Sequence, residues 1–323
     1  MATRARQRVA DLGVVSETVH AIEENIQWVL SGKDEVARLA ITALLAEGHI
    51  LIEDVPGVGK TLLARALATS IDCSVSRIQF TPDLLPSDVT GVSVYSPDTG
   101  EFEFTPGPIF ANIVLGDEIN RAGPKTQSAM LESMEERGVT IDGITHELAV
   151  PYMVIATQNP IELEGTYPLP EAQRDRFLMR LRIGYPDNES ELEILRTHGR
   201  GDPMAELEAV TDARTVAAAI EAVRRVAITD AMERYLIEVC RATRVHPDVE
   251  LGASPRASLG MLRATRAWAA ASDRDYVIPD DAKVLAPHVL PHRLILRPEA
   301  ELSGRTAEHI IDDVLASVPA PTE

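Results

Sequence analysis

The chain has 323 residues, 45% of them hydrophobic, so it can bury a large core and is expected to form two domains. Fifty acidic and 31 basic side chains give a net charge of −19, which disfavours nucleic acid and anionic membrane surfaces as partners. The two cysteines lie far apart, and no uncharged apolar run approaches ~18 residues. No signal peptide is expected, because no apolar stretch follows the charged N-terminal residues. We therefore expect a cytoplasmic protein with no stable membrane insertion.

The N-terminal part of the chain is predicted to be helical after a short frayed end at residues 1–14. A helix is expected to begin near Ser16, because apolar residues recur at helical spacing at Val19, Ile22, Ile26 and Val29. A second helix follows the break at residues 31–33, with an inner face of Val36, Leu39 and Leu44. It leads into a short apolar strand at residues 50–53.

A glycine-rich loop follows that strand and opens a further helix. This context is typical of a phosphate-binding loop, which would consist of Asp54, Val55, Pro56, Gly57, Val58, Gly59, Lys60 and Thr61. Glycines let the backbone approach a polyphosphate, and the N–H groups of the new helix point at it. Lys60 can reach the β- and γ-phosphates, and Thr61 can ligate Mg²⁺. Because Asp54 stands where the eight-residue pattern has Gly, a glycine turn before an ordinary helix remains the alternative.

Two hairpins are predicted within the first domain. Residues 92–95 and 101–104 alternate apolar and polar around a five-residue turn, an arrangement that would place four apolar side chains on one face: Val92, Val94, Phe102 and Phe104. A second hairpin at residues 139–148 is expected around the Asp142-Gly143 turn.

Acidic and polar side chains end two further predicted strands. Asp117 and Glu118 follow the apolar strand at residues 111–116, and Asn159 follows the strand at 152–156. Ligands bind at the carboxyl edge of an open parallel sheet. Asp117 could therefore hold Mg²⁺, and Glu118 could orient and deprotonate an attacking water. Asn159 could bond the γ-phosphate or that water. A solvated acidic turn and a simple Asn-Pro turn are the alternatives.

From Asp187 onward the chain has helical periods and no predicted strand. Strands that alternate with helices, followed by helices alone, indicate an α/β domain at residues 15–186 and a helical domain at residues 187–323. The boundary is expected near residues 184–188.

Several runs of sequence resemble the MoxR family of AAA+ ATPases, in the helix-2-insert clade. These runs are residues 54–61, 79–88, 100–108, 116–128, 156–173 and 252–257. The resemblance implies an AAA+ P-loop NTPase fold, with a parallel sheet flanked by helices and a C-terminal all-helical lid. It also implies ATP and Mg²⁺ as cofactors, and it makes the two hairpins the helix-2 insert and the pre-sensor-1 insert.

The same resemblance assigns roles to three polar residues. Asn159 would be the sensor-1 residue, and Arg176 would be the arginine finger that reaches the γ-phosphate of a neighbouring subunit. Arg256 would be the sensor-2 residue of the lid and would touch the γ-phosphate in cis. Arg174 stands where the family has Leu, so it competes with Arg176 for the finger role.

Together these features predict a Mg²⁺-dependent ATPase that assembles as a homo-oligomeric ring, by resemblance a hexamer, and remodels or activates a client protein. By the same resemblance, the client would be one with a von Willebrand factor A domain. Three alternatives stand beside it: a magnesium-chelatase-like motor subunit, a nucleic-acid-dependent motor, and a nucleotide-gated scaffold that does not hydrolyse ATP. The net charge of −19 argues against the nucleic-acid motor.

Overall fold

The computed structural model describes residues 2–159, 166–199 and 201–321. Its centre is a parallel five-stranded sheet in the order β2-β5-β8-β1-β9. The strands are β1 (Ile50–Glu53), β2 (Val75–Gln79), β5 (Ile113–Asp117), β8 (Met153–Gln158) and β9 (Met179–Leu181). Because all five run in one direction, one edge of the sheet carries every carboxyl end and the opposite edge every amino end. The strands predicted at residues 50–53, 111–116 and 152–156 are confirmed as β1, β5 and β8, with shifts of a few residues at their ends.

Both faces of the sheet are buried, and the alternation of side chains along each strand decides which core a residue joins. Ile50 and Ile52 of β1 face the helices α1 (Ala2–Val29), α2 (Asp34–Leu45) and α3 (Lys60–Ser70), whereas Leu51 faces the opposite side. That opposite side is covered by α4 (Pro86–Thr90) and α5 (Pro124–Glu136). The three inner strands β1, β5 and β8 are mainly apolar for this reason, whereas the edge strand β2 carries exposed polar side chains.

The predicted frayed end at residues 1–14 is wrong, because α1 is one helix that already begins at Ala2. Its buried stripe extends the expected pattern towards the N-terminus at spacings of three and four residues, through Val15 to Leu12. No proline interrupts the segment, so the first turns continue the same helix.

Both hairpins form, but the first has a different register from the predicted one. β3 (Gly91–Ser96) pairs with β4 (Glu101–Pro106), and Ser96 lies opposite Glu101, so the turn has one residue fewer than expected. A one-residue shift moves every side chain of one strand to the other face. Phe102 and Phe104 therefore share a face with Tyr95, and their predicted grouping with Val92 and Val94 is wrong.

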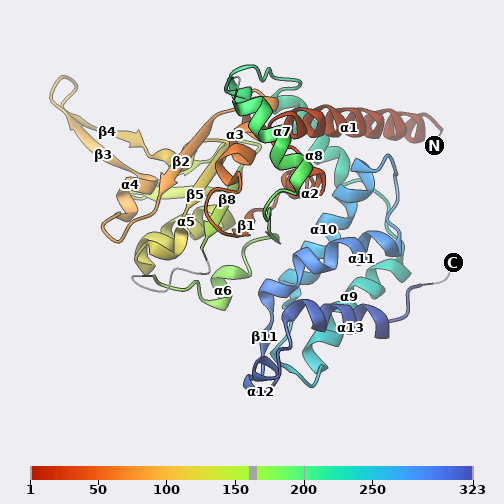
Figure 1. Ribbon diagram of the computed structural model, residues 1–323. Coiled ribbons are helices and arrows are strands. Elements are labelled where there is room, and N and C mark those ends of the chain that lie inside the picture. The colour runs from red at the N-terminus through yellow and green to blue at the C-terminus, as the bar shows by residue number, and fades with distance from the viewer. Residues whose placement is uncertain (1, 160–165, 200, 322–323) are drawn as a thin grey trace.

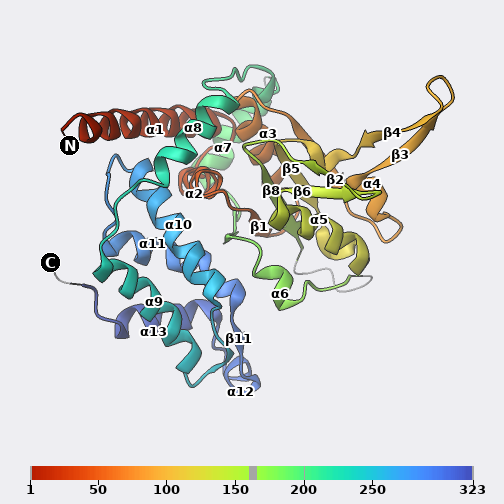
Figure 2. The same cartoon turned by 180° about the vertical axis from the view of Figure 1, so that it is seen from behind.

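The second hairpin joins β6 (Gly138–Ile141) to β7 (Ile144–Glu147). Its two turn residues, Asp142 and Gly143, both have positive φ angles, 51° and 81°, as a type I′ turn requires. The Phe104 ring stacks on His146 at 4.0 Å between centroids, so the two inserts contact each other. Figures 1 and 2 show β3 and β4 projecting from the end of the molecule farthest from the C-terminal helices.

The C-terminal region is mainly helical and also contains a small antiparallel ladder. Its helices are α7 (Asn188–His198), α8 (Ala213–Val223), α9 (Asp230–Val245), α10 (Pro255–Ala271), α11 (Pro279–Val289), α12 (Pro298–Leu302) and α13 (Ala307–Ser317). β10 (Val249–Leu251) pairs with β11 (Ile295–Leu296), which corrects the all-helical prediction. These strands are too short to produce a detectable period of two. Among the residues described, no helix has the length and apolar character needed to cross a bilayer.

Candidate functional site

The predicted phosphate-binding loop has the backbone geometry that its glycines suggest. Gly57 and Gly59 adopt φ angles of 84° and 100°, a region open mainly to glycine. Helix α3 begins at Lys60, so its unpaired N–H groups face the loop. The Lys60 Nζ atom donates to the Asp54 carbonyl at 2.8 Å, which folds the lysine back over the loop. This is a cradle for an anion at a helix N-terminus.

The structure also explains why Asp is acceptable at position 54, where the eight-residue pattern has Gly. The Asp54 carboxylate is buried and accepts from the Val55 N–H at 2.8 Å and from the Gly184 N–H at 2.6 Å. Gly184 lies after β9, at the predicted start of the connection to the C-terminal helices. Asp54 therefore ties the phosphate loop to that connection.

A cavity of about 520 Å³ brings the loop together with the carboxyl ends of β5 and β8. Its lining includes predicted site residues from three segments of the chain: Pro56, Gly57, Gly59, Lys60, Thr61, Asp117, Glu118 and Asn159. Burial lowers the pKa of Lys60, and the negative charges of Asp117, Asp54 and Glu118 act in the opposite direction. We call this the phosphate-loop cavity.

Asp117 and Glu118 are held by side chains that sequence reasoning missed. The Thr157 hydroxyl, on β8, donates to Asp117 Oδ1 at 2.6 Å and accepts from the Glu118 N–H at 2.9 Å. Arg77 donates to Asp117 Oδ2 at 2.6 Å, and Gln79 donates to Glu118 Oε2 at 3.0 Å. Thr157 could have been found, because it lies two residues before Asn159 and so on the same side of the strand.

Glu118 itself has an unusual backbone, with φ 58° and ψ 49°. A non-glycine residue in this left-handed region costs on the order of 1 kcal/mol and is often found at functional sites. Its carboxylate also accepts from Arg121 at 3.0 Å. The strand therefore ends at Asp117, and Glu118 lines the cavity rather than continuing the sheet.

The residues of this cavity fit a magnesium ion bound together with a nucleotide. The Thr61 hydroxyl and the Asp117 carboxylate are the hard oxygen donors that Mg²⁺ prefers, and both line the cavity. Within the described ranges, no cluster of three or more His, Cys, Asp or Glu side chains gathers in a metal-binding arrangement. A metal held here would therefore depend on phosphate oxygens and water for its other ligands.

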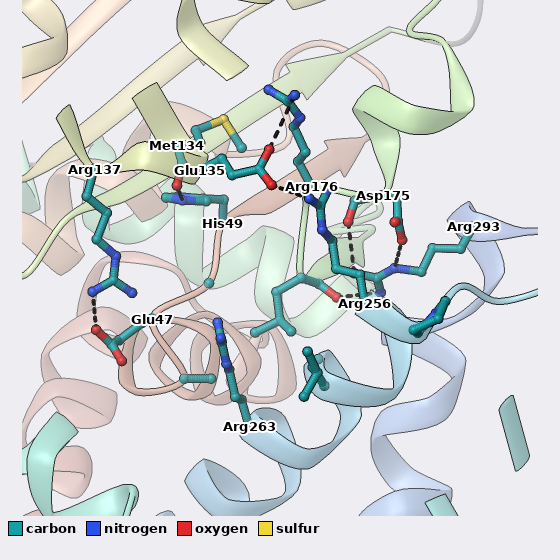
Figure 3. A pocket seen from close by; sticks show the side chains of 16 residues that line it. Glu47, His49, Met134, Glu135, Arg137, Asp175, Arg176, Arg256, Arg263 and Arg293 are labelled. Carbon is teal, nitrogen blue, oxygen red and sulfur yellow. Dashed lines mark hydrogen bonds and ion pairs between the residues drawn. The ribbon is translucent and has the colours of Figure 1, made fainter. Parts of the chain in front are cut away.

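The two predicted arginines lie elsewhere, in a second cavity of about 390 Å³ (Figure 3). Arg176 contacts Glu135 with 3.3 Å between its NH2 atom and Oε2, and Arg256 bonds the other oxygen of the same carboxylate. Three further arginines line this space, namely Arg137, Arg263 and Arg293. Among the described residues, its lining shares none with the phosphate-loop cavity. We call it the arginine cavity.

This second cavity lies at the amino edge of the sheet. His49 lines it and directly precedes β1, and Arg176 stands three residues before β9. Arg256, predicted to touch the γ-phosphate of its own chain, thus lies outside the lining of the phosphate-loop cavity in this structure. Arg174 is not part of the described lining and pairs at 3.9 Å with Glu171 in its own short helix, α6 (Glu171–Arg174).

The segment that carries Arg176 is clamped by the C-terminal helices. The Asp175 carboxylate accepts from Arg293 Nε at 2.8 Å and from the Ser254 hydroxyl at 2.9 Å. Ser254 is the N-cap of α10, two residues before Arg256. Arg293 is buried and also donates to the Phe177 carbonyl at 2.7 Å. One carboxylate, Asp175, thus places both arginine-bearing segments.

Comparisons with known proteins agree with this architecture. Residues 49–179 match the family described as ATPase family associated with various cellular activities (AAA), and residues 241–314 match the AAA lid domain. A crystal structure of a protein assigned as an ATPase, from Cytophaga hutchinsonii, superposes with a TM-score of 0.92 at 38% identity and covers 99% of both chains. The fold and the phosphate-loop cavity thus define an AAA+ ATPase, an enzyme that binds and hydrolyses ATP.

The relatives narrow this class. The chain is 42% identical to Chaperone MoxR1 of Mycobacterium tuberculosis over 96% of this chain and 84% of that protein. It is 32% identical to Protein MoxR of Methylorubrum extorquens over 93% and 94%. It is also 53% identical to the uncharacterized protein YeaC of Bacillus subtilis over 93% and 94%. The chain belongs to the MoxR family of AAA+ ATPases.

Proposed function

We propose that the chain works as a homo-oligomeric ring in which the arginine cavity of one copy completes the phosphate-loop cavity of the next, and that it uses Mg²⁺-dependent ATP hydrolysis to remodel client proteins. The observation that carries this proposal is the separation of the two cavities within one chain. The loop that grips phosphate and the arginines that neutralise its charge lie at opposite edges of the same sheet.

The length of the strands supports the assignment in trans. β1 has four residues, and each residue of a strand advances ~3.3 Å, so the two edges lie roughly 13 Å apart. The Asp175 clamp holds the backbone around Arg176 against the C-terminal helices and away from the carboxyl edge. Arg176 could reach the nucleotide of its own chain only if this clamp opened. A second copy can present its amino edge to that nucleotide with the clamp intact. Arg256 lies beside Arg176, which supports the proposal that Arg256 also acts on the nucleotide of a neighbouring copy.

Each residue then has a role in the reaction. The loop amides and Lys60 bind the phosphates, Thr61 and Asp117 hold the metal, and Glu118 orients a water and takes its proton. Asn159 hydrogen-bonds the water or the terminal phosphate. Arg176 and Arg256 of the neighbouring copy neutralise charge that develops in the transition state. Mg²⁺, when bound, adds charge neutralisation at the same phosphates. Hydrolysis would thus depend on assembly.

Client remodelling is supported by the name of one relative, a chaperone, and by the two inserts. Tyr95 and Phe102 form an exposed aromatic pair near the tip of the first hairpin, with ring centroids 5.5 Å apart. Exposed apolar surface of this kind is suited to contact with another protein. A protein with a von Willebrand factor A domain is the client class that the family resemblance suggests. A hexamer is the ring size that it suggests.

Mixing two inactive variants tests the trans arrangement. Lys60→Ala removes nucleotide binding and keeps the arginines, whereas Arg176→Ala keeps nucleotide binding and lacks the finger. Each alone should be nearly inactive, and a 1:1 mixture should recover about a quarter of the wild-type rate, because about one interface in four combines two intact halves. A mixture no more active than its components would contradict the proposal.

A further inference from the structure

We propose that Glu135 occupies, in each free subunit, the place that the terminal phosphate of the neighbouring copy's nucleotide takes on assembly. It would act as a positioning residue that keeps Arg176 and Arg256 together and competes with that phosphate. The inference rests on the trans arrangement proposed above and names a residue that this arrangement does not itself require.

The contacts of Glu135 carry this inference. Its two carboxylate oxygens bind two different arginines, Oε2 contacting Arg176 at 3.3 Å and Oε1 bonding Arg256. Figure 3 shows the carboxylate between the two guanidinium groups. One arginine belongs to the segment before β9 and the other to the first turn of α10, so a single acid joins the two parts of the molecule.

The other acids of the cavity already have arginine partners. Glu47 bonds Arg137 and Arg224, and Asp175 bonds Arg293. Of the three acidic side chains in the described lining, Glu135 is therefore the one that faces the predicted finger and sensor. Charge neutralisation at these two arginines depends on it.

The position of Glu135 on its helix is unfavourable for a carboxylate. It lies in the last turn of α5, next to Glu136, where the helix dipole disfavours negative charge by ~0.3–1 kcal/mol. The side chain is also more than one-third exposed, so water can reach it and a competing anion can displace it. The two guanidinium groups compensate for the unfavourable position of the Glu135 carboxylate, and nothing in the helix itself favours a negative charge there.

A carboxylate and a terminal phosphate offer guanidinium groups the same kind of acceptor. Both bind arginine through charge-assisted hydrogen bonds, and the phosphate has more oxygens and more charge. An isolated subunit would therefore keep its arginines in place but neutralised, with low affinity for stray anions. A correctly seated neighbour would replace the carboxylate, and the arginines would exchange one anion for another.

Binding of inorganic tripolyphosphate tests this exchange without requiring a ring. In the Lys60→Ala background, where the phosphate loop is disabled, adding Glu135→Gln should tighten tripolyphosphate binding by about fivefold or more, as measured by titration calorimetry. A further Arg256→Ala substitution should abolish the gain. Glu132→Gln is the matched control, because Glu132 is exposed on the same helix and the change in charge is identical.

A second measurement uses the active enzyme. Glu135→Gln should lower the protein concentration that gives half-maximal ATP turnover. Added salt should weaken assembly of this variant more steeply than assembly of the wild type, because the arginines of the variant no longer exchange one partner for another. Tripolyphosphate binding and an assembly midpoint that both match those of Glu132→Gln would overturn the role of Glu135. Failure of the mixing experiment alone, with tighter tripolyphosphate binding retained, would instead contradict the trans arrangement.

Discussion

The phosphate-loop cavity and the arginine cavity lie at opposite edges of one parallel sheet and differ in the charged side chains that line them. The first combines a glycine loop with Asp117 and Glu118, and the second gathers arginines around Glu135. In each, the key charges already have partners within the chain: Arg77 bonds Asp117, and Glu135 bonds Arg176. Under the arrangement proposed above, each cavity would supply one half of a reactive centre, and each half is neutralised within its own chain.

The largest expected effect comes from the arginine cavity. Arg176→Ala should lower ATP turnover by ~10³–10⁵, because charge that develops on the transferred phosphoryl group loses its partner. ATP binding, measured by calorimetry, should stay near the wild-type value, since the phosphate-loop cavity is intact. Arg174→Ala serves as the neighbouring control and should remain active. Normal turnover in Arg176→Ala together with an inactive Arg174→Ala would transfer the role to Arg174.

Loss of the carboxylate in the phosphate-loop cavity should have the next largest effect. Glu118→Gln should reduce phosphate release by ~10²–10⁴, because the amide cannot accept the proton of the attacking water. Nucleotide should still bind, so the variant should stall in the ATP state. A pull-down with this variant is then the best means of capturing a client. Undiminished phosphate release would remove Glu118 from the mechanism.

The smallest expected effect is a loss of folding stability at acidic pH, and it concerns a residue of the arginine cavity but none of the phosphate-loop cavity. His49 lines the arginine cavity; its Nδ1 atom accepts from the Val154 N–H at 3.0 Å, and its Nε2 atom lies 3.1 Å from the Met134 carbonyl. Burial lowers the pKa of His49 to about 4, because these surroundings favour the neutral ring.

The sign of the pH dependence follows from this lowered pKa. The unfolded chain takes up a proton near pH 6.5 and the folded chain only near pH 4, so stability is complete above pH 6.5 and declines as the pH falls through that window. By pH 4 the loss should reach roughly 3 kcal/mol. His49→Gln keeps a donor and an acceptor but does not titrate. In urea unfolding, its stability should therefore decline less than that of the wild type between pH 7 and 4. Parallel pH profiles would show that His49 is not protonated on unfolding.

The sequence by itself determined the parts of this protein that depend on local patterns. The phosphate loop, the acidic end of β5, both hairpins and most of the helices were predicted, because each is defined by a short period or by turn chemistry within about a dozen residues. Asp142-Gly143 alone specifies the second turn. The family resemblance then singled out Arg176 and Arg256, which no local pattern distinguishes from ordinary surface arginines.

Only the tertiary structure decided how these parts meet. A turn one residue shorter than expected moved Phe102 and Phe104 to the other face of the first hairpin, and packing of Phe104 on His146 accompanies that register. Packing also placed Arg256 at the amino edge of the sheet and set Glu135 between two arginines that lie 80 residues apart (256 − 176). Such contacts join distant segments, and their geometry depends on the whole core, so no local period or turn encodes them.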